Sequence, residues 1–210
     1  MKLLSKNLQG FDDVQVGKRE DIPIEKGAVL GEDFFEKNQD LVEKYCNFFT
    51  AYPDLFLDLI KPVDSSFSFF FYQRIVLRAL MRYKIVYISA CRAFSKSFLT
   101  ILALFLQCVF MPGTKRFICA PYKNQGAQIA KEKLTEIFRL FPLLRREVIG
   151  GSVAEVPGNY GKDYVTLRFR NGSEFTVVGA ADSTRGGRRH GGLLDELRDH
   201  DEKDITEIVL

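Results

Sequence analysis

Apolar side chains recur at three- and four-residue steps through the first part of the chain, which is the spacing of one face of a helix. Residues 31–60 carry this pattern, and Pro53 divides it into a longer and a shorter predicted helix. A further helix is predicted over residues 73–83, with a buried face formed by Ile75, Leu77, Leu80 and Met81. The arginines of that segment fall at four-residue intervals, which is typical of a solvated face: Arg74, Arg78 and Arg82.

Strand-like and helix-like segments alternate in the next part of the chain. Residues 84–89 form a β-rich run, residues 90–95 a loop, and residues 98–110 an apolar helix. A second strand, residues 115–120, precedes an amphipathic helix over residues 125–141. This order predicts an α/β fold with a mostly parallel sheet flanked by helices.

A β-hairpin is predicted over residues 165–177, where the apolar positions are all odd-numbered: Val165, Leu167, Phe169, Phe175 and Val177. A shared buried face therefore requires a loop with an odd number of residues. A three-residue loop, residues 170–172, meets this condition if Gly172 is left-handed. The expected pairs are Leu167 with Phe175, Thr166 with Thr176 and Arg168 with Glu174.

The composition is that of an ordinary globular protein, with 46% hydrophobic and 27% charged residues in a chain of 210. The patterns suggest an N-terminal arm with a helical region, residues 1–60, followed by a core, residues 61–210. Residues 61–194 contain 21 basic and 8 acidic side chains, whereas both flanking segments are acidic. This block predicts a polyanionic partner, nucleotide or nucleic acid, unless its charges are spread over an unpatterned surface.

The four cysteines and two histidines lack the spacing of a zinc site, so no zinc is expected. The apolar stretch at the N-terminus is too short for a cleavable signal, which favours a reducing cytosol. Residues 98–110 are apolar but fall short of the roughly twenty residues that a membrane span needs. We therefore expect a buried helix there and no membrane partner.

The junction between the first predicted strand and the helix after it has the layout of a phosphate-binding loop. The Walker A pattern requires glycine, four residues, glycine, lysine and a hydroxyl residue, and this chain has Ala90, Ser95, Lys96 and Ser97 there. No proline interrupts residues 91–97, so every backbone N–H remains available to a phosphate at a helix N-terminus. Lys96 is predicted to contact phosphate and Ser97 to bind Mg²⁺. The alternative is a solvated turn that happens to contain a lysine.

An apolar strand that ends in two carboxylates, residues 191–194 followed by Asp195 and Glu196, has the Walker B arrangement. Asp195 is predicted to hold Mg²⁺ and Glu196 to polarise the attacking water. The preceding segment, residues 182–190, is rich in glycine and arginine and is predicted to be a basic loop. Taken alone, the Leu-Leu-Asp-Glu string could also begin a helix.

In this order, the elements resemble the ATPase half of the large terminase subunit of tailed bacteriophages. The resemblance runs from about Phe67 to Glu202 and rests on Tyr72-Gln73, residues 91–97, Ala120-Pro121 with Gln125, Asn171-Gly172, Arg185-Gly186 and residues 193–196. It implies a P-loop sheet of the RecA (ASCE) type, with a helical N-terminal region and a β-hairpin before Walker B. Terminases have Walker A loops without the usual glycines, which fits Ala90 and Ser95.

The resemblance also implies residue roles, with ATP and Mg²⁺ as cofactors. Gln73 would read adenine beside the ring of Tyr72, although the spacing of this pair alone is that of ordinary helix residues. Glu196 would be the catalytic carboxylate, and Arg92 and Arg185 would sense the γ-phosphate. The metal ligands would be Ser97 and Asp195, and the nucleotide-binding residues Tyr72, Gln73, Ala90, Cys91, Arg92, Ala93, Phe94, Ser95, Lys96 and Ser97.

A terminase-like chain would be the ATPase part of a motor that translocates double-stranded DNA into a procapsid in the host cytoplasm. The implied partners are DNA, the portal protein, the small terminase subunit and further copies of the chain in a ring on the procapsid. The family continues after Walker B with a strand of the ATPase sheet and a nuclease domain, whereas this chain stops at Leu210. We therefore expect a truncated core without nuclease activity.

Two other functions fit the same residues. A helicase-like P-loop ATPase also combines a glutamine motif, a P-loop and an Asp-Glu pair, and DNA unwinding would favour it. Alternatively, the chain is a catalytically silent assembly or DNA-binding fragment, because the glycine-poor loop and the missing strand leave no working site. Hydrolysis by the isolated chain would argue against that alternative.

Overall fold

A computed structural model describes residues 37–91, 93–120, 122–150, 157–179 and 189–195. The chain divides into two compact units, residues 1–42 and residues 43–210. The description below concerns the second unit, which contains every predicted site residue.

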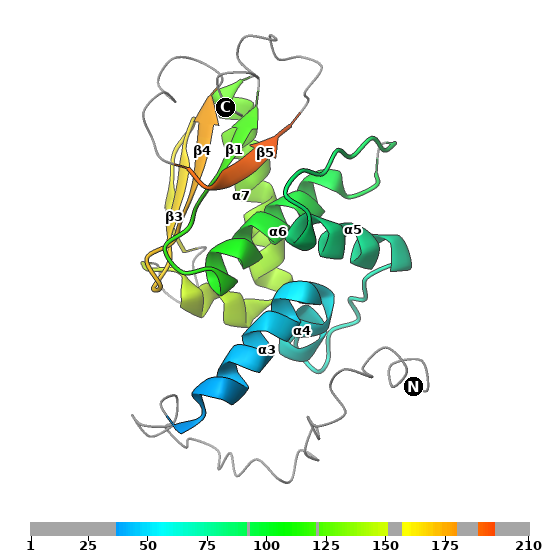
Figure 1. The fold of residues 1–210 in the computed structure, drawn as a ribbon. Helices are drawn as coiled ribbons and strands as arrows, with labels where there is room; N and C mark the ends of the chain where they lie inside the picture. The colour runs from blue at the N-terminus through cyan, green and yellow to red at the C-terminus, as the bar shows by residue number, and fades with distance from the viewer. Residues whose placement is uncertain (1–36, 92, 121, 151–156, 180–188, 196–210) are drawn as a thin grey trace. The chain divides into compact units, whose positions relative to one another are not determined.

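Five α-helices account for the helical segments that the apolar spacing predicts (Figure 1). They are α3 (Gln39–Ala51), α4 (Pro53–Ile60), α5 (Phe71–Arg82), α6 (Lys96–Phe110) and α7 (Lys123–Leu140), and a 3₁₀ helix, η1 (Pro142–Glu147), follows α7. Pro53 occupies the first turn of α4, where its missing N–H costs no hydrogen bond. The boundaries of α4, α5, α6 and α7 agree with the sequence pattern to within two residues, and the predicted start of the first helix, residue 31, lies outside the described residues.

A five-stranded mixed sheet has the order β2-β3-β4-β1-β5. Its strands are β1 (Lys115–Ala120), β2 (Asn159–Tyr160), β3 (Val165–Arg168), β4 (Glu174–Gly179) and β5 (Gly191–Leu194). β1 pairs in parallel with β4 and β5, and β3 pairs antiparallel with β2 and β4. The α/β prediction is confirmed, but the described sheet is mixed rather than mostly parallel because the hairpin contributes antiparallel pairs.

The hairpin between β3 and β4 has the predicted register. Thr166 pairs with Thr176, Leu167 with Phe175 and Arg168 with Glu174. Gly172 has φ +81°, and its N–H donates to the Phe169 carbonyl at 3.1 Å. The three-residue loop is thus confirmed, and parity was sufficient to predict it because one face of the hairpin is buried.

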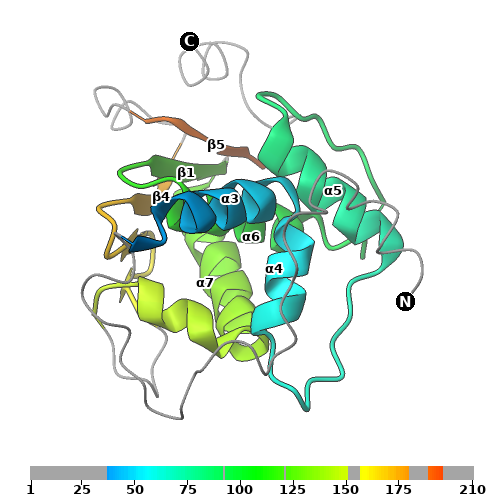
Figure 2. The ribbon, with the colours of Figure 1, turned by 60° about the horizontal axis from the view of Figure 1, so that its bottom comes forward.

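Helix α6 is the centre of the hydrophobic core, as its apolar sequence predicts. It packs against α5, α7 and three strands of the sheet. The core side chains with no exposed surface include Leu99, Leu102, Phe105, Leu134, Phe138 and Phe175. Figure 2 shows α6 and α7 on the same side of the sheet, so one sheet face is covered by these helices.

The predicted strand over residues 84–89 is wrong. Within the part of the chain that the structure describes, the backbone of residues 85–90 makes a single hydrogen bond, which Ala90 O accepts from the Lys96 side chain. The side chains of Ile85 and Tyr87 are 81% and 78% exposed. β-rich composition did not produce a strand here because no neighbouring strand pairs with the segment.

Two predictions about buried helix faces also need correction. Ile75 is 52% exposed on α5, whereas Leu77 and Met81 are buried. No residue of α3 is buried, although its aromatic stripe has the spacing of a core face. The stripe instead makes ring contacts along the surface, such as Phe49 with Phe56 at 5.5 Å between centroids. Among the described helices, none combines the length and the apolar character that crossing a membrane requires.

Candidate nucleotide-binding site

The predicted phosphate-binding loop leads directly into α6, and two of its residues have left-handed backbones. Ser95, the N-cap of α6, has φ 63° and ψ 27°, and Ala93 has φ 64°. A left-handed non-glycine residue costs about 1–2 kcal/mol. Ser95 occupies the position of the second Walker glycine, so the loop has a glycine-like conformation where the pattern requires it, without the glycine.

Lys96, the first residue of α6, folds back over this loop. Its Nζ donates to the Ala90 carbonyl oxygen at 2.8 Å, across the six-residue span that the Walker pattern prescribes. The ammonium group therefore lies above the concave side of the loop, next to the start of a helix whose dipole favours an anion. A phosphate in that position would compete with the carbonyl for the same ammonium.

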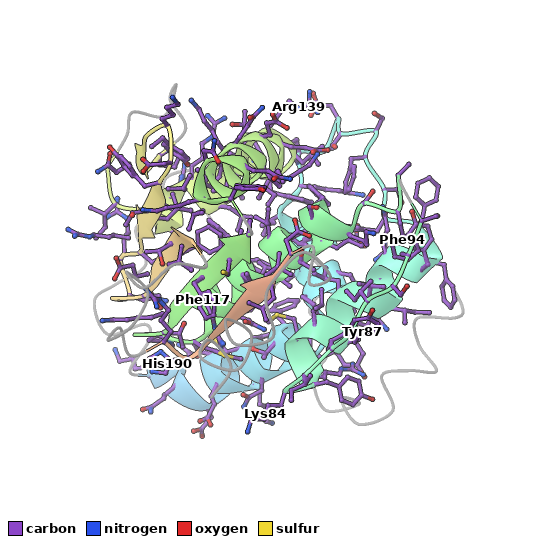
Figure 3. The ribbon with its side chains drawn as sticks, turned by 90° about the horizontal axis from the view of Figure 1, so that it is seen from above. Lys84, Tyr87, Phe94, Phe117, Arg139 and His190 are labelled. Carbon is purple, nitrogen blue, oxygen red and sulfur yellow. The ribbon has the colours of Figure 1, made fainter. Side chains whose placement is uncertain are left out.

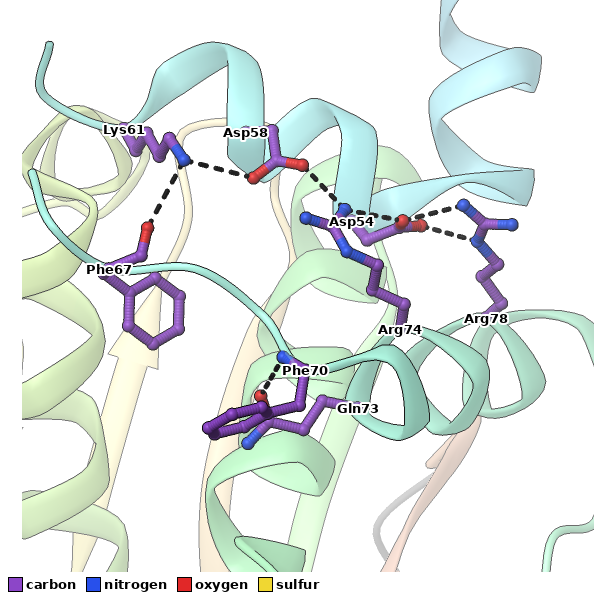
Figure 4. A network of polar contacts seen from close by, with 8 residues as sticks. All are labelled: Asp54, Asp58, Lys61, Phe67, Phe70, Gln73, Arg74 and Arg78. Carbon is purple, nitrogen blue, oxygen red and sulfur yellow. Dashed lines mark hydrogen bonds and ion pairs between the residues drawn. The ribbon is translucent and has the colours of Figure 1, made fainter. Parts of the chain in front are cut away.

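Gln73 connects this loop to α5. Its side chain is buried, its Oε1 accepts the Phe70 N–H at 3.0 Å, and its Nε2 donates to Ser95 Oγ at 3.4 Å (Figure 4 shows the bond to Phe70). Both ends of the amide are thus engaged within the protein. Each of these atoms keeps capacity for one more partner, because a side-chain amide has two donor hydrogens and two acceptor lone pairs, so the contacts with Phe70 and Ser95 do not conflict with the prediction that Gln73 reads adenine.

Tyr72 joins an aromatic stack beside the loop. Its ring lies 5.9 Å from Phe70 with an interplanar angle of 4°, and 4.6 Å from Phe94 with an angle of 32°. Phe94 comes from the loop and Tyr72 from α5. The stack therefore fixes one side of the loop against the helix, while the Phe70 ring remains largely exposed.

Chain geometry places Lys96, Ser97 and Asp195 at the same edge of the sheet. α6 has 15 residues and β1 has 6, so they are about 22 Å and about 20 Å long. A short turn, residues 111–114, joins the end of α6 to the start of β1, and α6 packs along β1. The start of α6 therefore returns to the carboxyl end of β1, where the Asp195 N–H donates to the Cys119 carbonyl at 3.0 Å.

The metal site that the sequence predicts has two described ligands, Ser97 and Asp195. Among the described residues, no group of three or more histidine, cysteine, aspartate or glutamate side chains could hold a metal by itself. Mg²⁺ commonly uses one or two protein ligands together with phosphate oxygens and water. The two-ligand set thus suits Mg²⁺ bound with a nucleotide. Glu196, Arg92 and Arg185, predicted to be catalytic, lie outside the described residues.

An open cavity of about 460 Å³ lies between α5 and residues 86–94. Its lining is mostly apolar and includes Ile75, Val76, Val86, Ile88 and Phe94. The volume is in the range of small-molecule sites. The lining also includes Ala90 and Cys91 of the predicted phosphate-binding loop but not Lys96, Ser97 or Asp195, so the cavity borders the first half of that loop.

An ion-pair network fastens α5 to α4, and the sequence analysis missed it. Asp54 is fully buried and accepts from Arg78 Nε and Nη2 at 2.7 Å each, and from Arg74 Nη1 at 3.0 Å (Figure 4). Arg74 also donates to Asp58 at 2.6 Å. The available signal was the matching four-residue interval of two aspartates and two arginines in neighbouring helices. The arginine stripe is therefore mainly a contact between helices.

The network shifts the pKa values of its members. Burial alone would raise the pKa of Asp54, but hydrogen bonds from Arg78 and Arg74 outweigh burial and hold it below the usual value. For Arg78, the hydrogen bond to Asp54 is the main cause of a raised pKa. All three groups stay charged at neutral pH. Since α5 carries Gln73, the network also positions the residue that bonds to Ser95.

No protein-family model matches the chain, and no curated protein matches it.

Proposed function

We propose that the chain is a P-loop ATPase of the terminase type, the part of a DNA-packaging motor that couples ATP hydrolysis to translocation of double-stranded DNA. The observation that carries the proposal is the Ala90–Ser97 loop. Ser95 is left-handed at the start of α6, and Lys96 spans the loop to Ala90. Asp195 follows a parallel strand at the same sheet edge. A phosphate, a metal and a positive charge have complementary partners there.

The roles follow from the chemistry of these groups. Lys96 would leave the Ala90 carbonyl for the β- and γ-phosphates, and Ser97 and Asp195 would hold Mg²⁺. Bound Mg²⁺ would neutralise charge that develops on the transferred phosphoryl group. Glu196 would orient the attacking water, and Arg92 and Arg185 would stabilise the γ-phosphate charge. Packaging partners of this ATPase would be the portal protein, the small terminase subunit and further copies in a ring.

A catalytically silent module is the second candidate, and one observation favours it. The outer edge of β5 and the backbone of residues 85–90 both lack a pairing strand among the described residues. Figure 3 shows β5 between β1, which carries Phe117, and the segment that carries Tyr87 and Phe94. A loop whose preceding segment is not held in the sheet would be less well positioned for catalysis.

Binding of a fluorescent ATP analogue with Mg²⁺ tests the proposal. We expect Lys96→Ala to weaken binding by about 10- to 100-fold, the equivalent of one charge-assisted hydrogen bond. Lys131→Ala, an exposed lysine on α7, is the matched control and should bind normally. Ser95→Gly restores the Walker glycine at a position that is already left-handed, and it should retain binding.

Measuring ATP hydrolysis distinguishes the terminase-type ATPase from the catalytically silent module. The ATPase predicts phosphate release that Glu196→Gln abolishes while binding persists. Binding without release in the unmodified chain would favour the silent module. Equal binding by the unmodified chain and Lys96→Ala would contradict the assignment of the loop itself.

A further inference from the structure

The two faces of the sheet differ in what covers them. Side chains of one face, such as Ile118 and Val177, belong to the main core with α6 and α7. Among the described residues, the opposite face contains one small buried cluster at the carboxyl end of the strands: Phe117, Cys119 and Val178, with Leu194 against them. The amino half of this face is formed by polar residues.

Strand register aligns charged residues across that half. Arg168 on β3 is opposite Glu174 on β4, and Glu174 is opposite Lys115 on β1. Directly opposed residues share a face, and Lys115 shares the face of Phe117 because side chains alternate along a strand. Arg168 and Lys115 are exposed and make no ion pair with any described carboxylate. Glu174 is the one acidic residue in the row.

The next row supplies hydroxyl and amide groups. Thr166 pairs with Asn159 on one side and Thr176 on the other. Arg189, just before β5, extends over the Phe117 ring with its guanidinium carbon 5.5 Å from the centroid. We call this set the polar sheet face: Asn159, Thr166, Arg168, Glu174, Thr176, Lys115 and Arg189.

Arg116, one residue after Lys115, belongs to the opposite, helix-covered face with Ile118 and Phe175, so its charge is not part of the polar sheet face. The guanidinium of Arg116 donates to the His190 carbonyl and to Met111 Sδ, and its Nε has no hydrogen-bond partner in the described structure. Burial lowers the pKa of Arg116, but the group remains a cation at neutral pH. His190 Nδ1 accepts the Lys115 N–H at 2.9 Å. A neutral His190 therefore carries its proton on Nε2, where it can donate to an anion.

We propose that the polar sheet face binds the phosphate backbone of double-stranded DNA. Adjacent strands are about 4.8 Å apart, so Arg168 and Lys115 are separated by about 10 Å across β4. That length of duplex axis carries about six phosphate charges. Threonine hydroxyls and an asparagine amide are typical phosphate ligands. The choice of DNA among polyanions rests on the proposed function, whereas the charge arrangement does not.

The small number of exposed aromatic rings on this face favours duplex over single-stranded DNA. Proteins that bind single strands stack bases on exposed aromatic rings. Among the described residues, two aromatic rings lie at this face: Phe117 is buried beneath Arg189, and Tyr164, directly before β3, is 39% exposed and donates its hydroxyl to Asn159 Oδ1 at 3.4 Å. Contacts would therefore be made to phosphates, which a duplex presents as a stiff, regular row.

This face and the nucleotide site lie at different ends of the strands. Lys115 begins β1, whereas Asp195 follows the carboxyl end of β5. DNA on the polar sheet face would leave the Ala90–Ser97 loop, called the Walker loop here, open to nucleotide. A variant can therefore lose duplex binding and keep nucleotide binding, or the reverse.

The test is fluorescence anisotropy of a labelled DNA duplex with the full chain over a range of salt concentrations. Lys115→Gln with Arg168→Gln should weaken binding at least tenfold at low salt and reduce the slope of log K against log salt by about 2. Glu174→Gln removes the acidic residue of the row and should strengthen binding several-fold. Because this change has the opposite sign, misfolding would not reproduce it.

A control variant on α7 tests whether the duplex binds at the polar sheet face. Lys131→Gln with Arg139→Gln removes two exposed charges on α7, and Figure 3 shows Arg139 on the side of the molecule opposite His190. This variant should bind duplex within about twofold of the unmodified chain. Equal loss in both double variants would overturn the proposal, as would tighter binding to a single strand of the same length. Lys96→Ala should lose nucleotide and retain duplex.

Discussion

Two short apolar segments of this chain, each beginning with lysine and containing isoleucine and an aromatic residue, have different structures. Residues 115–120, KRFICA, form β1 inside the sheet, whereas residues 84–89, KIVYIS, form no strand and pair with no strand among the described residues. Ile118 is 2% exposed between β4 and β5. Ile85, an equivalent side chain in the other segment, is almost entirely exposed. β propensity describes how well a side chain suits a sheet, and a strand forms only where another strand supplies hydrogen bonds.

The comparison matters for the candidate site because each segment leads to one part of it. β1 holds β5 and therefore Asp195 through parallel pairing. Residues 84–89 lead to the Walker loop, which is held instead by α5 through Gln73 and the Tyr72–Phe94 contact. The predicted metal ligand Asp195 is thus held by the sheet, whereas the predicted phosphate-binding loop is held by a helix.

Hydrogen exchange should show the largest difference between the two segments. Amides of residues 117–119 should exchange only when the sheet unfolds, whereas those of residues 85–88 have no hydrogen-bond partner in the part of the chain that the structure describes. We expect exchange in the second segment to be faster by a factor of about 1,000 or more. Mass spectrometry of peptic peptides measures both segments in one experiment. Comparable protection in both would mean that residues 85–88 pair in solution.

Alanine variants of one isoleucine in each segment test the same comparison through the free energy of unfolding. Ile118→Ala should reduce the free energy of unfolding by about 2–5 kcal/mol because it leaves a cavity in the core. Ile85→Ala removes the same atoms from an exposed position and should change it by less than about 0.5 kcal/mol. Urea unfolding followed by circular dichroism measures both. A large loss in Ile85→Ala would show that the segment is buried in solution.

Breaking the ion pairs that attach α5 to α4 should cause a smaller loss of stability, confined mainly to α5 and the loop that α5 holds. Asp54→Asn leaves Arg74 and Arg78 without their buried partner, and we expect a loss of about 2 kcal/mol, since both arginines are partly solvated. Hydrogen exchange should increase in α5 and the Walker loop more than in β1. Uniform acceleration throughout the chain would contradict this separation.

The pH dependence of the same variant has a definite sign. The pKa of Asp54 is lower in the folded chain than its usual value of 3.8, so its contribution is present above about pH 4 and is lost as the pH falls further. The unmodified chain should therefore lose stability below about pH 4 more steeply than Asp54→Asn. Urea unfolding at a series of acidic pH values gives both curves, and parallel curves would refute the assignment.

The sequence predicted correctly those features of the fold that a single physical condition determines. Parity determined the hairpin register because a one-residue shift would expose Leu167 and Phe175. The apolar run that became α6 could be stable only when surrounded by other elements. For the candidate site, spacing predicted the loop, the lysine position and the strand before Asp195. It missed the engagement of Gln73 with Ser95, which are 22 residues apart.

The sequence by itself determined the helices, the hairpin and the strands β1 and β5, since periodicity and turn chemistry act over a few residues. Only the tertiary structure decided that residues 84–89 remain unpaired and that Arg74 and Arg78 bind Asp54. It also placed Arg168 and Lys115 on one sheet face. Each of these outcomes depends on which distant segment lies alongside, and pairing between distant segments is set by packing of the whole chain rather than by local preference.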